Sequence, residues 1–239
     1  AGINAKSFIY NEQGLTLKRN EAYIGVLIDD LITKDTDEPY RMFTSRAEYR
    51  ILLRFSNAHS RLINKSIKNE LIDKELRVKI NEILKTIETI KKNINKSVDI
   101  QTANKILKSS KEKTIKFKQS LKKLLKRPGV GIGTIIKNSE VVLRGIEINK
   151  ETLEEVLIEI EALIKYNGYI KRQDKQIAKI AKSERLKIPE DFDYLRLKNI
   201  SNEGREKLSN IKPENLGQAM RISGITPADI SVLSVMLTK

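Results

Sequence analysis

Apolar residues recur at helical spacing over much of the chain. Between Glu21 and Thr33 they gather on one face of a predicted helix, behind an Asn20 that is suited to cap it. From Leu76 to Ile94 the apolar positions alternate steps of four and three residues, and lysines fill the remaining faces. This is the pattern of a long helix that packs against another helix. Both segments therefore predict amphipathic helices with one buried face.

Two capping signals predict further helices. Ser45 and Glu48 have the spacing of a capping box, so we expect a helix from there to about Phe55. Asn149 precedes a run that is acidic in its first half and basic in its second half, up to Lys175. The helix dipole favours this order of charges, so the run predicts a helix capped by Asn149.

A short basic helix is predicted before Pro128. Its apolar positions are Phe117, Leu121 and Leu124, and the proline ends it. The glycine-rich segment 129–133 follows a helix and lacks the lysine and hydroxyl residues of a phosphate-binding loop. It therefore predicts a turn.

The last part of the chain predicts three short helices. Ser201 caps one that runs through Leu208. Pro213 opens one that runs through Arg221, and Thr226 with the proline after it begins the last. Strand signals are few, namely Leu15 to Leu17, Tyr40 to Phe43 and Val141 to Ile148. The pattern as a whole predicts a mainly α protein.

Composition excludes several classes of site. The 239 residues are 39% hydrophobic without a long apolar stretch, so neither a membrane span nor a signal peptide is expected, and the protein is predicted to be cytoplasmic. The absence of cysteine excludes disulfides, thiolate metal sites and a cysteine nucleophile. The single histidine, His59, cannot form a zinc site alone and is predicted to lie in a solvated loop.

Positive charge is concentrated in the middle of the chain. The formal net charge is +15, and residues 65–127 alone carry 17 Lys and 2 Arg against 7 acidic residues. Scattered surface lysines would be the simpler explanation for any one position. The concentration nevertheless favours a polyanionic partner such as nucleic acid, which releases counterions when cations neutralise its phosphates.

An arginine cluster indicates where phosphates could bind. Arg46, Arg50 and Arg54 recur every four residues, so they share one face of the predicted helix, with aromatic side chains among them. Guanidinium groups suit phosphate geometry, and aromatic rings can stack on unpaired bases. The alternative is a helix whose arginines pair with Glu48 and Asp37. The other candidates for phosphate contacts are Arg41, Arg61, Lys122, Lys123, Lys126 and Arg127.

The segment 216–230 predicts two short helices joined around Gly224. Such a hairpin can present backbone amides to phosphate, or it can display outward-facing side chains to a protein. Residues 189–239 carry seven basic and seven acidic side chains, and a neutral surface steers a polyanion weakly. Protein binding is therefore the preferred interpretation. Its candidate contacts are the outward-facing Gln218 and Arg221, together with Ile222 and Gly224.

Five segments resemble the MnmG (GidA) family of tRNA wobble-uridine modification enzymes, in the family's order. They are Glu21 to Leu31, Glu38 to Arg50, Tyr166 to Gln173, Ile188-Pro189 with Asp193-Tyr194, and Leu216 to Ala228. The beginning of the chain, Ala1 to Ala5, resembles the tail of the family's second flavin-domain signature. The lysine-rich middle carries no family motif.

The resemblance implies a fold and a set of cofactors. Family members use FAD, NADH and a methylene-folate donor, work with a GTPase partner and are expected to form homodimers. Residues 1–62 would be the C-terminal end of an FAD-binding α/β domain. An all-helical part would follow, with a basic long-helix domain (63–188) and a short-helix subdomain (189–239). The residues at the edge of the FAD site would be Ala1, Gly2 and Asn4.

The resemblance also implies roles for the candidate residues. The arginines and the Lys122 to Arg127 cluster would bind tRNA, and the hairpin around Gly224 would dock the GTPase. The family's catalytic cysteines would lie outside this chain, which alone is therefore predicted to be inactive. One departure is Asp35, where the family usually has glycine, so a positive φ there would strain the turn modestly. The alternative is a stand-alone basic helical protein that binds nucleic acid and has no enzymatic activity.

Overall fold

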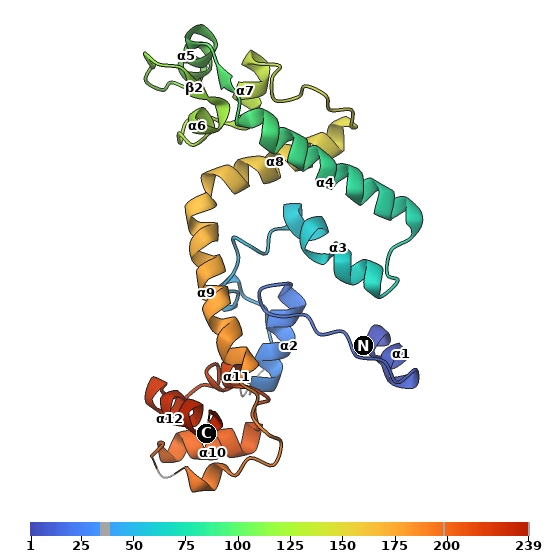
Figure 1. Cartoon of the computed structure of the whole chain (residues 1–239), viewed down its shortest axis with the longest axis vertical. Helices are drawn as coiled ribbons and strands as arrows, with labels where there is room; N and C mark the ends of the chain where they lie inside the picture. The colour runs from blue at the N-terminus through green and yellow to red at the C-terminus, as the bar shows by residue number, and fades with distance from the viewer. Residues whose placement is uncertain (34–38, 198, 239) are drawn as a thin grey trace. The chain divides into compact units, whose positions relative to one another are not determined.

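The chain folds into two compact units. The computed structural model describes residues 1–33, 39–197 and 199–238 (Figure 1). Unit 1 consists of Ala1–Leu53 and Lys171–Lys239, and unit 2 consists of Arg54–Ile170. The domain boundaries near residues 62 and 188 stay a prediction. Asp35 and Asp37 lie outside the described residues.

Unit 2 is built from helices around one hydrophobic core. Its helices are η2 (Phe55–Asn57), α3 (Ala58–Lys68), α4 (Lys74–Ile94), α5 (Ile100–Ser109), α6 (Leu121–Leu125), α7 (Ile132–Asn138) and α8 (Lys150–Lys165). The strands β1 (Ser97–Val98) and β2 (Gln119–Ser120) pair antiparallel. The core draws on α4 through α8, with Ile90, Ile106, Leu124 and Ile160 fully buried. The predicted mainly α fold is therefore confirmed.

The long helix α4 forms as its sequence pattern predicts. Asp73 caps it, because its carboxylate accepts the backbone N–H of Leu76 at 2.7 Å. The apolar positions from Ile80 to Ile94 are buried, and α4 packs against α8. Leu76 itself is exposed, so the buried seam begins one turn later than predicted. Asn149 caps α8 in the same way, through the N–H of Thr152.

Unit 1 combines the beginning of the chain with its end. Its helices are α1 (Gly2–Ile9), α2 (Tyr23–Thr33), η1 (Thr44–Arg46), α9 (Asn167–Arg185), η3 (Tyr194–Arg196), α10 (Asn202–Ile211), α11 (Leu216–Ala219) and α12 (Pro227–Leu237), and the chain passes from unit 2 into unit 1 within α9. One core cluster holds Val26, Tyr49 and Leu53 against α9. A second cluster lies among η3, α10, α11 and α12.

The caps of α10 and α12 are confirmed and meet at one carboxylate. Ser201 caps α10 through the N–H of Gly204, and Thr226 forms a capping box with Asp229 at the start of α12. Asp229 also accepts the N–H of Ser201 at 2.8 Å, so it joins the first turns of two helices. Burial by itself raises the pKa of Asp229, but the hydrogen bonds from Ser201 and Thr226 outweigh it and lower that pKa.

The predicted helix from Ser45 to Phe55 is wrong. Only the short η1 forms there, Ser45 makes no capping bond, and Ala47 is extended with φ −97° and ψ 102°. The physical reason is tertiary, because Arg19 takes the Glu48 carboxylate that the capping box needs and also donates to a carbonyl in η1. Arg46, Arg50 and Arg54 therefore do not share a helix face.

The prediction of which face of α2 is buried is also wrong. Ile24, Ile28 and Leu31 are about half exposed, whereas Gly25 and Val26 are buried. The reason is a close backbone approach. A Cβ on Gly25 would collide with the carbonyl oxygens of residues 17 and 18, so the glycine side of α2 packs inward.

Several other local predictions are wrong. The run after Asn149 forms two helices, α8 and α9, which separate at Tyr166 before the weak helix formers Asn167 and Gly168. Asn215, not Pro213, caps the helix that follows it. Other corrections are that Phe117 precedes the basic helix, Gly133 lies within α7, His59 lies half-buried within α3, and residues 15–17, 40–43 and 141–148 form no strands.

The described residues contain no candidate for a membrane-spanning helix. None of their helices combines the length and the apolar character that crossing a membrane would require.

Candidate functional site

A buried ion-pair network organises unit 1 around Arg19. Its guanidinium is 3.0 Å from Asp29, 2.7 Å from Asp30 and 2.7 Å from Glu48, and the Arg19 residue is only 7% exposed. Burial by itself lowers the pKa of Arg19, but Asp30 and Glu48 raise it above its ordinary value. The network therefore connects the segment before α2, α2 itself and the segment after η1.

Arg221 extends this network from the terminal hairpin. Its Nε and Nη2 donate to the two carboxylate oxygens of Asp29 at 2.7 and 2.8 Å, a bidentate pair across 192 residues. Its Nη1 lies 3.5 Å from Glu184, which also pairs with Lys18 at 2.8 Å. Arg221 was predicted to face outward toward a partner, but its charge is used inside unit 1.

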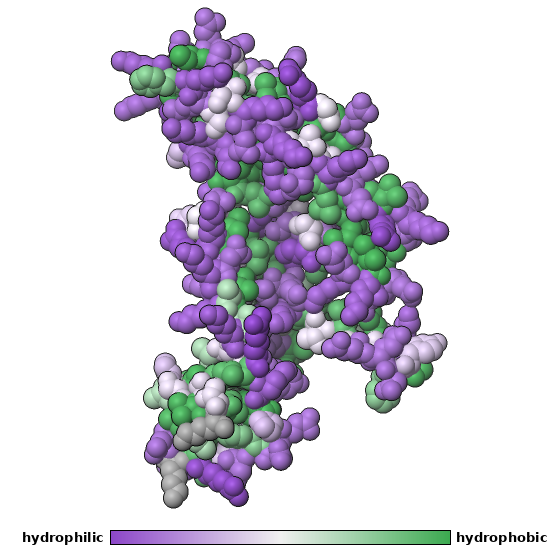
Figure 2. Space-filling view, in the orientation of Figure 1, coloured by the Kyte–Doolittle hydropathy of each residue, from purple (hydrophilic) through white to green (hydrophobic). Residues whose placement is uncertain are grey.

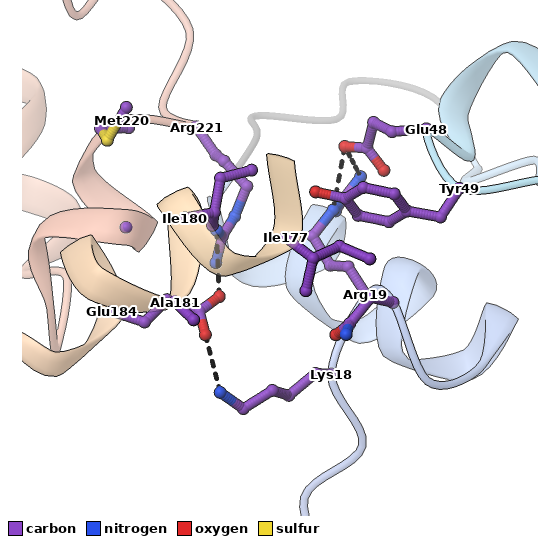
Figure 3. A pocket seen from close by; sticks show the side chains of 12 residues that line it. Lys18, Arg19, Glu48, Tyr49, Ile177, Ile180, Ala181, Glu184, Met220 and Arg221 are labelled. Atoms are coloured by element: carbon purple, nitrogen blue, oxygen red, sulfur yellow. Dashed lines mark hydrogen bonds and ion pairs between the residues drawn. The ribbon is translucent and has the colours of Figure 1, made fainter. Parts of the chain in front are cut away.

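A cavity of about 260 Å³ lies beside this network (Figure 3). Tyr49, Ile177, Ile180 and Met220 contribute apolar walls, and the charged groups stand around them. The ion pairs drawn in Figure 3 join Glu184 to its two cationic partners and Arg19 to Glu48, so the charges neutralise one another. This arrangement stabilises the unit, and it offers no concentrated charge to a polyanion.

The aromatic partner of Arg46 is Tyr40. The guanidinium carbon of Arg46 lies 4.9 Å from the ring centroid, and its Nη1 is 3.8 Å from Asp30. The hydroxyl of Tyr40 donates to Asp30 at 2.8 Å. Burial first, and then Asp30, raises the pKa of Tyr40. Arg46 is therefore partly committed inside unit 1, while Arg41 and Arg50 are exposed.

Arg54 and Arg61 make structural contacts within unit 2. Arg54 pairs with the buried Glu159 at 2.7 Å, and Ser56 Oγ donates to the same carboxylate at 2.6 Å. Arg61 donates to the Arg54 carbonyl at 3.0 Å and to Asn57 Oδ1 at 2.7 Å. The alternative interpretation of the arginine cluster, ion pairing, thus describes Arg54, although its partner is Glu159.

Unit 2 carries exposed cations on several elements, including Lys74, Arg77, Lys79 and Lys85 on α4, and a dense group of them lies on α5, on α6 with its C-cap, and on the segment between these helices. The exposed residues of this dense group are Lys105, Lys108, Lys111, Lys113, Lys116, Lys118, Lys123 and Lys126. Lys122 is half-exposed, and Arg127 donates to the carbonyl of Lys113 at 2.6 Å. This part of unit 2 is largely hydrophilic in Figure 2. We call these residues, with Phe117, the basic surface.

Sequence reasoning named only Lys122, Lys123, Lys126 and Arg127 of the basic surface as candidate contacts, and it missed the lysines of α5 and of segment 111–118. The lysines of segment 111–118 contributed to the charge excess, but the predicted helix made Phe117 a core position. The structure places Phe117 outside any helix with 79% of its surface exposed. A cue was available in the sequence, because four lysines within eight residues around one aromatic residue do not match a buried helical face.

The terminal hairpin presents few of its predicted contact residues. Ile222 is 3% exposed and belongs to the core, so its side chain offers little surface to a partner. Gln218 is half-exposed and accepts the N–H of Glu214 at 2.8 Å. Gly224 is exposed with φ +90°, which is the left-handed conformation that glycine adopts readily. The exposed apolar side chains here are instead Met220, Val235 and Met236.

The residues expected at a flavin edge lie at the start of α1. Ala1 and Gly2 are exposed. The Asn4 amide is engaged on both sides by Leu15, accepting its N–H at 2.7 Å and donating to its carbonyl at 3.0 Å. Among the described residues no strand leads through a glycine-rich turn into a helix, so they do not form a dinucleotide cradle by themselves. These residues also contain no cluster of three potential metal ligands from His, Cys, Asp and Glu.

Comparison with known proteins matches the chain to one family. The model of the tRNA modifying enzyme MnmG/GidA C-terminal helical domain matches residues 73–174, and that of the C-terminal helical bundle of the same enzyme matches residues 176–239. The chain is 43% identical to the tRNA uridine 5-carboxymethylaminomethyl modification enzyme MnmG of Cytophaga hutchinsonii and 45% identical to that of Alkaliphilus metalliredigens. Both alignments cover 99% of this chain but only 38% and 37% of those proteins.

Solved structures agree with the sequence comparisons. Aquifex aeolicus GidA in its form II crystal superposes with a TM-score of 0.77 at 35% identity, covering 100% of this chain and 36% of that one. The form I crystal gives a TM-score of 0.70 over 99% of this chain. The chain thus spans little more than a third of the length of these relatives. Two matching family models and a shared fold show that the chain belongs to the MnmG/GidA family of tRNA-modifying enzymes, in its C-terminal helical region.

Proposed function

We propose that the chain provides tRNA binding and partner docking to an enzyme that modifies the wobble uridine of tRNA. The observation that carries the proposal is the basic surface of unit 2, where eight exposed lysines gather on α5, α6 and the segment between them. Ammonium groups at such density neutralise phosphates and release counterions from a polyanion. The relatives' names specify tRNA uridine, so tRNA is the polyanion we propose.

The residues proposed to contact tRNA form two groups, one exposed to solvent and one engaged in contacts within the chain. Lys123, Lys126, Arg41 and Arg50 are exposed, and their charges are accessible to phosphate. Arg46, Arg54, Arg61 and Arg127 contact groups of their own units, so we propose for them a smaller direct share in tRNA affinity. Lys122, which is half-exposed, joins the first group.

The tRNA proposal is tested by the salt dependence of affinity. The full chain should bind a tRNA transcript, with log affinity falling linearly in log salt concentration. Replacing Lys122, Lys123 and Lys126 together by alanine should lower the slope by roughly one per lost phosphate contact. The matched control replaces three exposed lysines of α9, Lys175, Lys179 and Lys182. The proposal would be contradicted by an affinity that does not change with salt concentration, or by an equal loss of tRNA affinity in both triple variants.

A second surface, on α11 and α12, is proposed to dock the GTPase partner. Residues 189–239 are charge-balanced, and Met220, Val235 and Met236 are 48%, 55% and 46% exposed. Apolar anchors on a neutral surface suit a protein interface better than a phosphate backbone. This chemistry also favours the enzyme-associated role over the alternative, a stand-alone nucleic-acid-binding protein, which needs no protein partner.

Point substitutions test docking without removing the core. Met220→Glu with Met236→Glu should abolish capture of the pathway GTPase while leaving tRNA affinity within about twofold, because neither residue belongs to the basic surface. Ala228→Glu, an exposed position in the first turn of α12, is the matched control. Loss of tRNA binding with intact GTPase capture would reverse the two assignments.

The redox chemistry of the whole enzyme is proposed to depend on FAD and NADH held elsewhere. The described residues form no dinucleotide cradle, and Asn4 is already hydrogen-bonded to Leu15. The purified 239-residue chain is therefore expected to be colourless and inactive alone. Stoichiometric flavin absorbance after purification would contradict this. We further propose a cytoplasmic location and a homodimeric intact enzyme.

A further inference from the structure

An exposed phenylalanine lies in the lysine-rich segment between α5 and α6, which is part of the basic surface. Phe117 is 79% exposed, at a bend between α5 and β2. Lys116 and Lys118 flank it directly, and both are exposed. From Ile100 to Ile158, all of which the structure describes, no other large hydrophobic residue is exposed between these two ends.

The backbone around Phe117 is held in place on both sides. Asn104 accepts the N–H of Ile115 at 2.8 Å and donates to its carbonyl at 3.0 Å. Arg127 binds the carbonyl of Lys113. On the other side, Gln119 belongs to β2 and pairs with β1. The ring thus projects from a short bridge between two fixed points, so little backbone freedom remains to be lost when a ligand binds.

The acidic neighbour of this segment does not cancel its charge locally. Glu112 accepts the N–H of Gly129 at 3.0 Å and lies 3.9 Å from Arg127. The lysines at 111, 113, 116 and 118 are therefore exposed cations in the same eight-residue segment as the ring. Lysine is depleted at the centres of protein interfaces, and one aromatic residue supplies too little apolar area to anchor a helix in a membrane.

An aromatic face among cations matches an unpaired nucleotide. Its base stacks on the ring while the phosphates on either side meet ammonium groups, a combination that recurs in proteins that bind single strands. A duplex keeps its internal bases paired and stacked, so it offers a free face only at its two terminal pairs. We propose that Phe117 stacks on an unpaired base of the bound RNA, an inference that rests on the proposed tRNA binding and adds the site that recognises a single-stranded segment.

The first test compares ligands that do and do not offer unpaired bases. Phe117→Ala in the full chain should weaken binding of a tRNA transcript and of a single-stranded RNA 12-mer about 5- to 150-fold, the range of one lost base stack. Binding of a blunt RNA duplex should hardly change. The salt slope should also be unchanged, because no phosphate contact is lost, whereas Lys116→Ala lowers it. Phe55→Ala is the matched control, since Phe55 is 80% exposed in the same unit.

The second test reads stacking directly. The chain contains no tryptophan, so Phe117→Trp introduces a single indole, whose emission can be excited apart from that of the seven tyrosines. Saturating single-stranded 12-mer should quench its emission, the duplex should not, and Phe55→Trp should respond to neither. If native chain binds the transcript but Phe117→Ala binds equally well and Phe117→Trp is not quenched, stacking is refuted while tRNA binding stands. If the native chain binds no RNA, the proposed function itself fails, and this inference fails with it.

Discussion

Replacing Arg54 by alanine should destabilise unit 2, and its direct effect on tRNA affinity should be smaller than that of the lysine triple variant. Arg54 donates to both oxygens of Glu159, at 2.7 and 3.2 Å, and the Glu159 side chain is only 4% exposed. Removing the arginine leaves that carboxylate buried, with Ser56 Oγ at 2.6 Å still donating to it. An ionised carboxylate that loses its cation in a buried site is costly, because water cannot replace the lost interaction.

The expected cost is about 3 kcal/mol, the lower end of the range for breaking a buried pair, because Ser56 remains and Arg54 is itself 15% exposed. A loss of this size lowers Tm by roughly 6–12 °C for a chain of this length. Arg50→Ala is the control, because Arg50 is exposed, and it should change stability by no more than about 0.5 kcal/mol.

Urea unfolding of the full chain, followed by helical circular dichroism, measures the effect. Adding Glu159→Gln to Arg54→Ala should recover part of the loss, because it removes the buried charge. A loss below about 1 kcal/mol for Arg54→Ala, or a double variant less stable than the single one, would refute the reasoning. If Arg54→Ala lowered tRNA affinity at low temperature as much as the lysine triple variant does, Arg54 would have to be counted among the main tRNA contacts.

Three further outcomes are expected in unit 1. Gly25→Ala should destabilise the chain by about 1–3 kcal/mol in urea unfolding, because the added methyl group would collide with the carbonyls of Leu17 and Lys18. Unchanged stability would show that α2 can move away from these carbonyls. Above the ordinary Asp pKa of about 3.9, the native chain should be more stable than the Asp229→Asn variant. This difference in stability should shrink as the pH falls through the lowered pKa that Asp229 has in the folded state. A difference that does not depend on pH would contradict the prediction. Burial raises the pKa of Tyr194 to about 12 in the folded chain, whereas in the unfolded chain tyrosine ionises at about pH 10. The folded state should therefore lose stability as the pH rises above about 10. In melting curves, Tyr194→Phe should remove part of this loss at alkaline pH.

Helix starts show how far short-range signals reach. Asn149, Ser201 and Thr226 were each expected to cap a helix, and each accepts the predicted backbone N–H. A cap involves atoms within four residues, so the chain needs no distant partner to form it. The seam of α4 from Ile80 to Ile94 was predictable for a related reason, because a continuous apolar stripe has to be buried wherever its partner lies.

The capping box at Ser45 shows where such signals fail. Its spacing was suitable, but Arg19 takes the Glu48 carboxylate, and burial of Tyr49 and Leu53 against α9 favours turns there. Arg221 was expected to face a partner, yet it pairs with Asp29, 192 residues away. Nothing in the local sequence distinguishes an arginine that will meet a carboxylate across the fold from one that will remain in solvent.

The sequence by itself therefore determined the helical class, the helix starts at Asn149, Ser201 and Thr226, the family resemblance and the concentration of positive charge between residues 65 and 127. Only the tertiary structure decided which cations are accessible, because Arg54, Arg127 and Arg221 are committed to partners while the lysines around Phe117 are exposed. The physical reason is range. Caps and periodicity depend on neighbours a few residues apart, whereas burial and ion pairing depend on segments that only folding brings together.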